Sequence, residues 1–424
     1  MARSQTHALH NLESDRRSSC RERTAAVERP APCYHLLNVS RASDYDAAFR
    51  RQTGWTGADG TYSVALRDGR TLWLFSDTLI GKVDARGQRM RDHRIARSPA
   101  GEFLINNSIA IQSSRNPASM RFYTAVNGDA PASVFTPRDK GRWFWINAGV
   151  LNPDDTITVL LNAFELSTDP HFSFGKQVSL CAAELTLHGN TLRVGSYRRI
   201  HSVDAADNAG NETVWGGAIL EDGLWTYIYG SQFTVGSPSS KRGLVIARTP
   251  TGRLGDSDAW RFFAGNSYEK DSRRALRIPL AVPNEFSVQQ LSSGRYLLTL
   301  ADRSGPISLC FADAATGPWS EPQPIWKTPE VTDTVFAYHP KAHPGLSDQR
   351  GLLISYNVNS CDLHESMVEA DIYRPRFIRV PWESIEWLSG ITDVPLWDAQ
   401  HIYQPGLPTL LTSKRSSNSL QREH

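Results

Sequence analysis

Hydrophobic and polar positions in the central part of the chain follow the pattern of short β-strands. Residues 57–78 read GADGTYSVALRDGRTLWLFSDT, in which the runs TYSVAL and TLWLF flank a turn at Asp68-Gly69. An Asp-Gly turn between two such runs is typical of a β-hairpin. From about residue 45 to about residue 385, similar runs alternate with Gly, Pro, Asn and Asp, without a convincing helical period. The pattern therefore predicts an all-β chain.

The first hairpin has counterparts further along the chain. Each has a polar opener, a strand of small residues, a turn, and a strongly apolar strand with a polar end; they are residues 145–164, 212–231, 284–303 and 339–360. Their spacing of roughly 50 to 85 residues leaves room for a four-stranded blade and a loop. Five such units predict a five-bladed β-propeller. A β-sandwich is the alternative, but it does not explain why the polar openers recur.

The predicted propeller spans residues 45–400. We expect residues 1–44 to form a disordered or weakly ordered extension and residues 405–424 a disordered tail, because both segments are polar with few large apolar residues. Closure of the ring is expected to join a strand near residues 33–39 or residues 373–380 to the last blade.

Carboxylates are frequent at the ends of the repeated hairpins. In a propeller, the start of each innermost strand and the end of the second strand lie around one channel mouth, so these side chains should converge; they are Asp59, Asp77, Glu212, Glu285 and Asp302. Crowded carboxylates raise one another's pKa, and paired carboxylates carry out glycoside hydrolysis. We therefore expect Asp59 to act as base or nucleophile, with Glu285 or Glu212 as the general acid.

Other polar and aromatic residues near the same mouth are candidates for substrate binding. They are Asp77, Asn106, Asn107, Trp145, Asn162, Trp215, Asp302, His343 and Asn357. Each also has a structural interpretation: the aromatic rings can pack between blades, Asp and Asn can cap turns, and His343 can be satisfied in the interior.

Composition narrows the class of partner. The net charge of +2 favours neither nucleic acid nor an anionic membrane, and no run approaches the roughly 18 apolar residues of a membrane span. We expect a monomer that binds a carbohydrate or another small polar ligand. Residues 1–32 lack the apolar segment of a secretory signal, which favours a cytoplasmic location. Five scattered cysteines predict incidental thiols and no metal site. No cofactor is expected, with a structural cation in the channel as the one possibility left open.

Several segments resemble a family of five-bladed propeller domains long catalogued as being of unknown function, some of which are endo-D-arabinanases that act on mycobacterial cell-wall arabinan. The segments are GWTGADGTYSVALRDGRTLWLFSDTLIG (54–81), NNSIAI (106–111), KAHPGLS (341–347), LLISYNVNS (352–360) and YRPRFIRV (373–380). The resemblance implies that Asp59 is a catalytic carboxylate, that Asp77 lies at the edge of the active site, and that the substrate is an arabinan-like, furanose-containing glycan.

One departure from the family pattern keeps a second function open. The family's second blade often opens with a WPGDG-like turn, whereas residues 145–149 read WINAG and contain no acid. The hydrolase prediction therefore stands beside a non-hydrolytic alternative, either a sugar-binding propeller or an intracellular enzyme of specialised metabolism on the same scaffold. A protein-interaction propeller is a third hypothesis, which predicts a flat apolar face.

Overall fold

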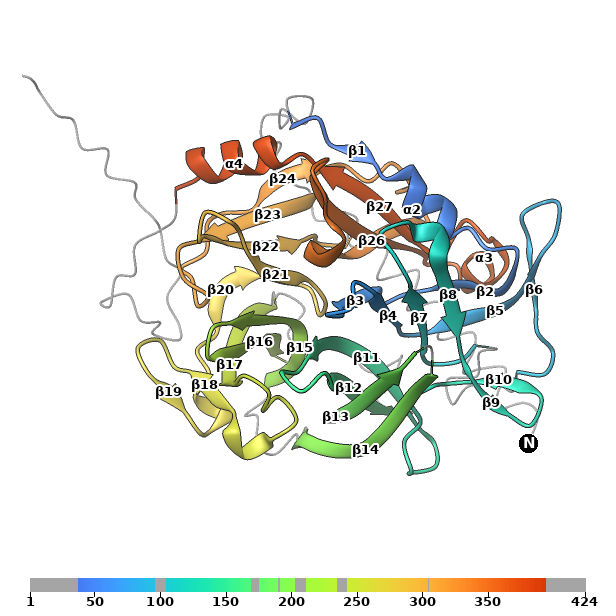
Figure 1. Ribbon diagram of the computed structural model, residues 1–424, viewed down its shortest axis with the longest axis horizontal. Coiled ribbons are helices and arrows are strands. Elements are labelled where there is room, and N and C mark those ends of the chain that lie inside the picture. Colours follow the sequence, from blue (N-terminus) through green and yellow to red (C-terminus); the bar gives the residue numbers. More distant parts are fainter. Residues whose placement is uncertain are drawn as a thin grey trace, which may run out of the picture.

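The computed structural model describes residues 37–95, 104–168, 175–189, 191–202, 211–234, 242–303 and 305–393. These residues form short antiparallel strands with a few short helices, which confirms the all-β prediction (Figure 1). The extension predicted for residues 1–44 lies outside the described residues up to residue 36, and the predicted tail, residues 405–424, lies outside them entirely. The first described strand, β1 (Ser40–Arg41), precedes the predicted boundary at residue 45.

Within the described residues, five antiparallel sheets have four or more strands each. In pairing order, the first two are β3 (Tyr62–Ala65), β4 (Thr71–Phe75), β7 (Ser108–Gln112) and β8 (Met120–Tyr123), then β11 (Arg142–Leu151), β12 (Ile157–Glu165), β13 (Lys176–His188) and β14 (Thr191–Ser202). The third is β15 (Asn211–Asp222), β16 (Trp225–Thr234), β17 (Gly243–Pro250), β18 (Arg261–Phe263) and β19 (Tyr268–Glu269), with β20 (Ile278–Ala281) on β17. The last two are β21 (Ser287–Gln290), β22 (Tyr296–Leu300), β23 (Ile307–Ala312) and β24 (Gln323–Trp326), then β25 (Val335–Ala342), β26 (Leu352–Ser360), β27 (Pro375–Val380) and β1.

Each repeated hairpin of the sequence forms the first two strands of one sheet. The first strands β3, β11, β15, β21 and β25 contact one another in that order, and Figure 1 shows the sheets following one another around the molecule. In the first hairpin, Tyr62 pairs with Leu74 and Ala65 pairs with Thr71. The turn between them uses Gly69 at φ +84°, a conformation that glycine adopts without steric cost.

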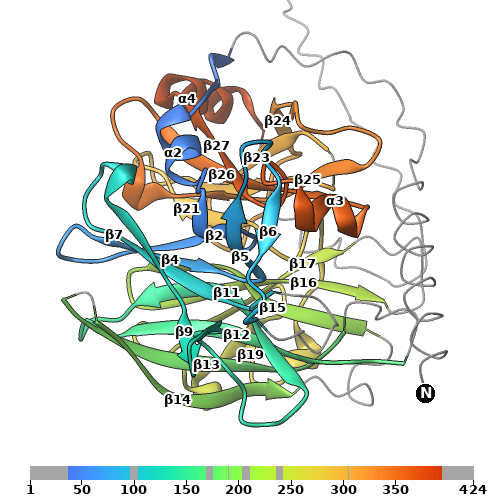
Figure 2. The same ribbon diagram turned by 90° about the vertical axis from the view of Figure 1, so that its right-hand side faces the viewer.

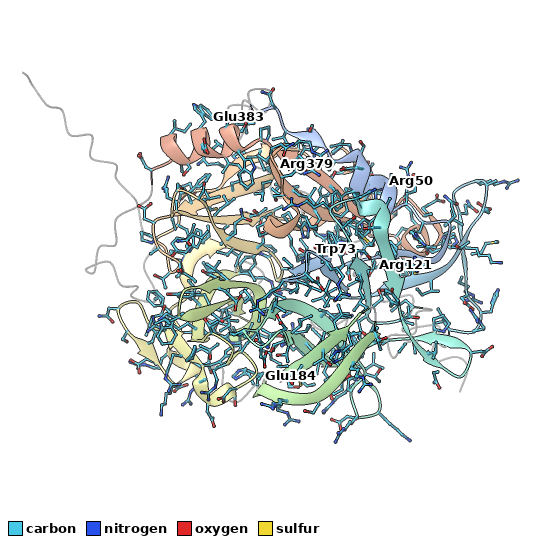
Figure 3. The ribbon with its side chains drawn as sticks, in the orientation of Figure 1. Arg50, Trp73, Arg121, Glu184, Arg379 and Glu383 are labelled. Atoms are coloured by element: carbon cyan, nitrogen blue, oxygen red, sulfur yellow. The ribbon has the colours of Figure 1, made fainter. Side chains whose placement is uncertain are left out.

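The second strand of each sheet is largely buried on both faces, which explains why its sequence is mostly apolar. In β4, Leu72 and Leu74 pack against the second sheet, whereas Trp73 and Phe75 point to the opposite face, toward the fifth sheet. Trp73 lies near the centre of the molecule in Figure 3. The same division occurs in β22, where Leu297 and Leu298 belong to different core clusters. Alternate side chains of a strand point to opposite faces, so a strand between two cores favours apolar side chains on both of its faces.

Five core clusters of described residues each join two successive sheets, and one of them joins the last sheet to the first. That cluster contains Phe377 of β27, Trp73 of β4, and Phe49, which directly follows helix α2 (Ser43–Ala48). The strand β1 adds the outermost pairing, Ser40 with Arg379 of β27. Of the two segments considered for closure, residues 373–380 therefore provide β27, and β1 directly follows residues 33–39.

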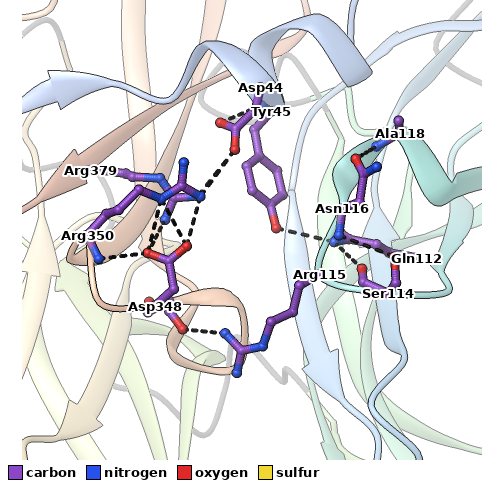
Figure 4. Close-up of polar contacts among 11 residues, drawn as sticks. Asp44, Tyr45, Gln112, Ser114, Arg115, Asn116, Ala118, Asp348, Arg350 and Arg379 are labelled. Carbon is purple, nitrogen blue, oxygen red and sulfur yellow. Dashed lines mark hydrogen bonds and ion pairs between the residues drawn. The ribbon is translucent and has the colours of Figure 1, made fainter.

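Polar contacts reinforce the same junction (Figure 4). Arg379 lies 3.4 Å from Asp44 and 3.3 Å from Asp348, and Asp348 also binds Arg350 at 2.8 Å. On the other side of α2, Gln112 of β7 donates to the Tyr45 hydroxyl at 3.2 Å. The segment that precedes the first sheet thus binds both the last sheet and the first.

Smaller elements were not anticipated from the sequence. A three-stranded sheet of β2 (Thr53–Ala58), β5 (Thr78–Val83) and β6 (Arg89–Arg91) extends beyond the first hairpin, and β9 (Ala125–Asn127) pairs with β10 (Ala130–Ala132). Two more helices are α3 (Leu363–Val368) and α4 (Trp382–Ile391), which flank the fifth sheet (Figure 2). The helix α4 packs Ile385 and Leu388 onto the core between the fourth and fifth sheets. Helices this short carry too few turns to establish a helical period in the sequence.

Cysteines follow the sequence prediction only in part. Cys181 and Cys310 are buried free thiols, but Cys361 is disulfide-bonded, so the expectation of an incidental thiol is wrong there. Among the described helices, none combines the length and the apolar character needed to cross a membrane.

A single buried arginine ties the small sheet to helix α3. Arg89 of β6 donates to Thr56 Oγ1 at 2.8 Å and to the carbonyl oxygens of Ser366, Met367 and Ile372 at 3.1, 2.9 and 3.1 Å. Its side chain is buried. Losing these donors would leave buried carbonyl groups without partners, which is costly.

We therefore expect Arg89→Met to lower the free energy of unfolding by about 3 kcal/mol, because hydrogen bonds from a charged donor contribute about 1.5–3 kcal/mol each and are not additive. Urea denaturation measures this, with Arg86→Met at the exposed turn between β5 and β6 as the matched control. Equal stability of the two variants would contradict the role of Arg89.

Candidate functional site

Irregular pairing interrupts the first strands of three of the five large sheets. The register between the first and second strands skips two residues in β11 at Asn147-Ala148, in β15 at Gly216-Gly217, and in β25 at His339-Pro340. Such bulges bend a strand and redirect its side chains. In the first and fourth sheets the corresponding segments are the turns just before β3 and β21, which carry Asp59 and Glu285.

Asp59 lies in a tight turn between β2 and β3. Gly60, at φ +82°, approaches Ser76 so closely that a Cβ atom would lie 2.9 Å from the Ser76 backbone nitrogen. The Ser76 amide donates to the Asp59 carbonyl at 3.0 Å, and the Asp59 amide donates to the Asp77 carbonyl at 3.3 Å. The two ends of the opening hairpin are thus neighbours, as the sequence predicted.

Two tyrosines hold the Asp59 side chain. The hydroxyls of Tyr338 and Tyr373 donate to Asp59 Oδ2 at 3.1 and 3.3 Å, whereas Oδ1 is buried and has no hydrogen-bond partner. Burial, followed by the negative charge of Glu285, raises the pKa of Asp59 to about 7, while the tyrosines and Lys341 oppose that rise. Asp59 therefore exchanges its proton near neutral pH, as a general acid or base requires.

Glu285 forms an ion pair with a buried lysine. Lys341 Nζ donates to Glu285 Oε2 at 2.7 Å and also to the carbonyl oxygen of Gly60, beside Asp59. Its ammonium group lies 4.3 Å from the centre of the Tyr62 ring. Burial lowers the pKa of Lys341, although Glu285 and Asp59 both act to raise it. The two carboxyl groups therefore share one cation but occupy different surroundings.

His339, which was not a candidate in the sequence analysis, lies beside Glu285. His339 Nδ1 lies 3.4 Å from Glu285 Oε1, but it makes no hydrogen bond there. Burial lowers the pKa of His339 to about 4, so the ring is neutral at pH 7 and the contact is not an ion pair. We name Asp59, Glu285, Lys341, His339, Tyr338 and Tyr373 the Asp59 cluster.

Asp77 forms a second polar group beside the Asp59 turn. Its Oδ1 accepts from Asn106 Nδ2 at 3.0 Å and from Trp145 Nε1 at 2.8 Å. The three side chains come from the first two sheets and are all partly exposed. The structure thus brings together three of the residues predicted to bind substrate.

Glu212 does not join the Asp59 cluster. It stands near the start of β15, before the bulge at Gly216-Gly217, and its nearest charges are Arg242 and Lys176. Burial raises the pKa of Glu212 above its usual value, and Arg242 opposes that rise. The sequence predicts Glu212 as the polar residue at the start of this strand, but the bulge at Gly216-Gly217 lies several residues further along.

Five further candidates are buried side chains with structural contacts. Asn107 bonds the backbone of Phe135 and Phe144, and Asn162 accepts from Gln177 at 2.9 Å. Trp215 is 2% exposed and packs against Trp260 and Phe262. The remaining two are His343 and Asn357.

His343 and Asn357 support the site from within. His343 lies between Ser63 and Ser355, at 2.7 and 2.8 Å, and burial lowers its pKa to about 3. Asn357 donates to the Ala58 carbonyl at 3.2 Å and to Thr61 Oγ1 at 3.1 Å, so it positions the Asp59 turn rather than a ligand. Asp302, by contrast, is exposed beyond the end of β22.

Sequence reasoning missed His339 and Tyr373 as members of the Asp59 cluster. Both adopt positive φ angles, +51° and +63°, which are uncommon for residues other than glycine and mark local constraint. Their only signal in the sequence was proximity to Pro340 and Pro375, within segments already noted for other reasons.

Within the described residues, no group of three or more His, Cys, Asp or Glu side chains is arranged to hold a metal ion. The structural cation considered from the sequence has no ligand set of that kind among these residues.

The raised pKa of Asp59 has a consequence for stability. The folded chain retains the Asp59 proton between the usual carboxyl value of 3.8 and about 7, so wild-type stability falls as the pH rises through that window. We expect Asp59→Asn to be more stable than wild type above about pH 7, by up to about 4 kcal/mol at about 1.4 kcal/mol per pKa unit, and to lose this advantage near pH 4. Urea denaturation across that range measures the difference; a difference independent of pH would contradict the burial account.

Several solved structures are similar to this chain. A crystal structure of a Bacteroides ovatus protein described as a putative hydrolase is 20% identical, covers 88% of this chain and 100% of its own, and has a TM-score of 0.64. An arabinanase from Bacillus subtilis (9% identity, 78% of this chain, 98% of that chain, TM-score 0.41) and an endo-arabinanase from Bacillus licheniformis (9%, 82%, 97%, 0.38) are less similar. The search among curated proteins returned no match.

The Bacteroides ovatus protein therefore shares the fold of this chain. A family model described as "Domain of unknown function (DUF5005)" matches residues 42–387. This range includes every strand of the five large sheets except β1. Since this match covers most of the chain, the protein belongs to the DUF5005 family.

Proposed function

We propose that the protein is a glycoside hydrolase that acts on a furanose-containing, arabinan-like glycan, with Asp59 and Glu285 as its catalytic carboxyl groups. The observation that carries this proposal is the contrast between them: Asp59 is partly buried, with a buried Oδ1 atom and a pKa raised to about 7, whereas Glu285 is paired with Lys341. Two interacting carboxyl groups in unlike environments are typical of glycosidases, in which one holds a proton and the other is ionised.

The surroundings of the two carboxyl groups favour Asp59 as the general acid and Glu285 as the base or nucleophile, which is the reverse of the roles expected from the sequence. Protonated Asp59 would donate its proton to the glycosidic oxygen as the bond to the anomeric carbon breaks, and the tyrosines at Oδ2 would orient the carboxyl group. Glu285, paired with Lys341, would assist attack on the anomeric carbon, either by taking a proton from water or by attacking directly. Asp77, Asn106 and Trp145 offer a partly exposed surface for sugar hydroxyls and a sugar face.

We further propose that the five large sheets are the blades of a five-bladed propeller, with the Asp59 cluster at the channel mouth. Support comes from the order of contacts among the first strands and from the core cluster between the last sheet and the first. The fold shared with the Bacteroides ovatus protein, described as a putative hydrolase, is compatible with the proposed reaction.

The main alternative is a sugar-binding protein without hydrolytic activity. It is favoured by the second sheet, where the position that carries an acid in the resembling family is occupied by Asn147-Ala148. Asn147 is buried and donates to the Trp215 carbonyl at 2.7 Å. This alternative predicts glycan binding without release of reducing ends.

The role of Asp59 as acid predicts the pH dependence of hydrolysis. With Asp59 required in its protonated form, we expect kcat/KM to fall as the pH rises through about 7. Initial rates on the best substrate across the neutral range measure this dependence. A rate that instead rises through the same range would assign Asp59 the role of base.

Substitution of Asp59 tests its part in the reaction. We expect Asp59→Asn to reduce kcat by at least about 100-fold, since acid–base groups contribute roughly 10²- to 10⁴-fold. Wild type and variant are assayed for release of reducing ends from D-arabinan, L-arabinan and a glycan panel. The matched control is Asp68→Asn, an exposed carboxylate in the same hairpin.

Three outcomes are decisive. Loss of activity in Asp59→Asn with a wild-type rate in Asp68→Asn supports the proposal, and full activity of Asp59→Asn removes Asp59 from the mechanism. Glycan binding by wild type without any hydrolysis across the panel supports the sugar-binding alternative.

A further inference from the structure

A polar cavity is lined by residues that flank Tyr373 in the sequence, Ile372 and Arg374 among them. Its volume is about 500 Å³, within the roughly 300–1,000 Å³ range of small-molecule sites. It is bounded by helix α2, the segment before β25, and the loop before β27. The lining residues with charged side chains are Arg41, Asp46, Arg50, Glu330, Asp371, Arg374 and Arg376.

Arg374 is the unusual member of this cavity. Its side chain is 2% exposed, and its Nη2 donates to Asp371 at 2.7 Å. Its Nε and Nη1 atoms are buried and have no hydrogen-bond partner. Buried, unpaired donors on a charged group are costly to a folded protein, so they suggest a ligand that completes the site.

The other arginines of the cavity are largely engaged. Arg41 binds Glu330 at 2.6 Å, and Arg376 donates to the backbone carbonyl of Arg374 at 3.2 Å. Burial, followed by the neighbouring charge of Arg374, lowers the pKa of Arg376 to about 10. Arg50 stands at the rim, 63% exposed and 3.6 Å from Asp371 (Figure 3).

The charge balance of the cavity favours an anionic ligand, as the unpaired donor atoms of Arg374 do. Four arginines face three carboxylates in the lining, which leaves an excess of positive charge in a partly enclosed space. Arginine is the preferred partner of carboxylate and phosphate groups, because its planar guanidinium presents several donors in fixed directions. An anionic group would satisfy Arg374 and reduce its repulsion with Arg376.

We propose that this cavity binds an oxyanion, the carboxylate or phosphate group of a small ligand, with Arg374 as its buried anchor and Arg50 at its entrance. Apolar contacts from Val335, Val358 and Ile372 would pack against the uncharged part of the ligand. The proposal does not depend on the hydrolase proposal. The site is nevertheless adjacent to the Asp59 cluster, because Tyr373, which donates to Asp59, directly precedes Arg374.

Calorimetric titration at constant ionic strength tests the site with two probes, inorganic phosphate and glucuronate. We expect one saturable site per wild-type chain for at least one probe. Binding by phosphate alone indicates a phosphate-bearing ligand, and binding by glucuronate alone indicates a carboxylate-bearing one. Arg374→Met should weaken binding by at least about tenfold, since a charged hydrogen bond contributes about 1.5–3 kcal/mol.

Substitutions at two exposed arginines, Arg50 and Arg86, provide a second test and a control. Arg50→Gln should weaken binding severalfold without affecting folding, and it decides the question if Arg374→Met does not fold. Arg86→Gln, on the turn between β5 and β6, should bind like wild type. The proposal is overturned if wild type binds neither probe into the millimolar range, or if Arg50→Gln and a folded Arg374→Met bind like Arg86→Gln.

Discussion

Burial of the second strand of each sheet on both faces is the constraint on which the rest of the structure depends. Leu72 and Leu74 of β4 contribute to one core cluster, and Trp73 and Phe75 to the next. Each sheet is therefore held between two neighbours, and no large sheet could be removed without exposing two apolar surfaces. The cluster around Trp73 and Phe377 joins the last sheet to the first, so the same packing brings these two sheets together.

This packing positions the candidate site. The innermost strands can deviate from regular pairing at the bulges because the second strands behind them are fixed. The bulge at His339-Pro340 places His339 beside Glu285, and His343, just after β25, lies in the interior between Ser63 and Ser355. Hydrogen bonds from Asn357 to the Ala58 carbonyl and from the Ser76 amide to the Asp59 carbonyl hold the Asp59 turn in place. These bonds position the carboxyl group whose pKa is raised.

The sequence predicted the fold better than the site. The recurring hairpins gave the first two strands of every large sheet, because a strand between two cores is recognisable as an apolar run. Asp59, Asp77 and Glu285 lie directly beside strand ends, where the hairpin pattern puts them, and their roles stay predictions. Glu212 lies apart from the Asp59 cluster and His343 takes the interior position that the sequence left open, because a bulge shifts the alternation of side chains and leaves no distinctive pattern in the sequence. His339 and Tyr373 depend on positive φ angles, and Arg374 depends on a cavity formed by segments over 300 residues apart in the chain.

The central claim is that Asp59 retains a proton to near-neutral pH because it is buried beside Glu285. Carboxyl-carbon NMR titration of wild type and Asp59→Asn tests this claim without reference to any substrate. The account predicts one carboxyl resonance that titrates near pH 7 in wild type and is missing from the variant. If every carboxyl group that differs between the two spectra titrates close to the usual value of 3.8, the account of the site is contradicted.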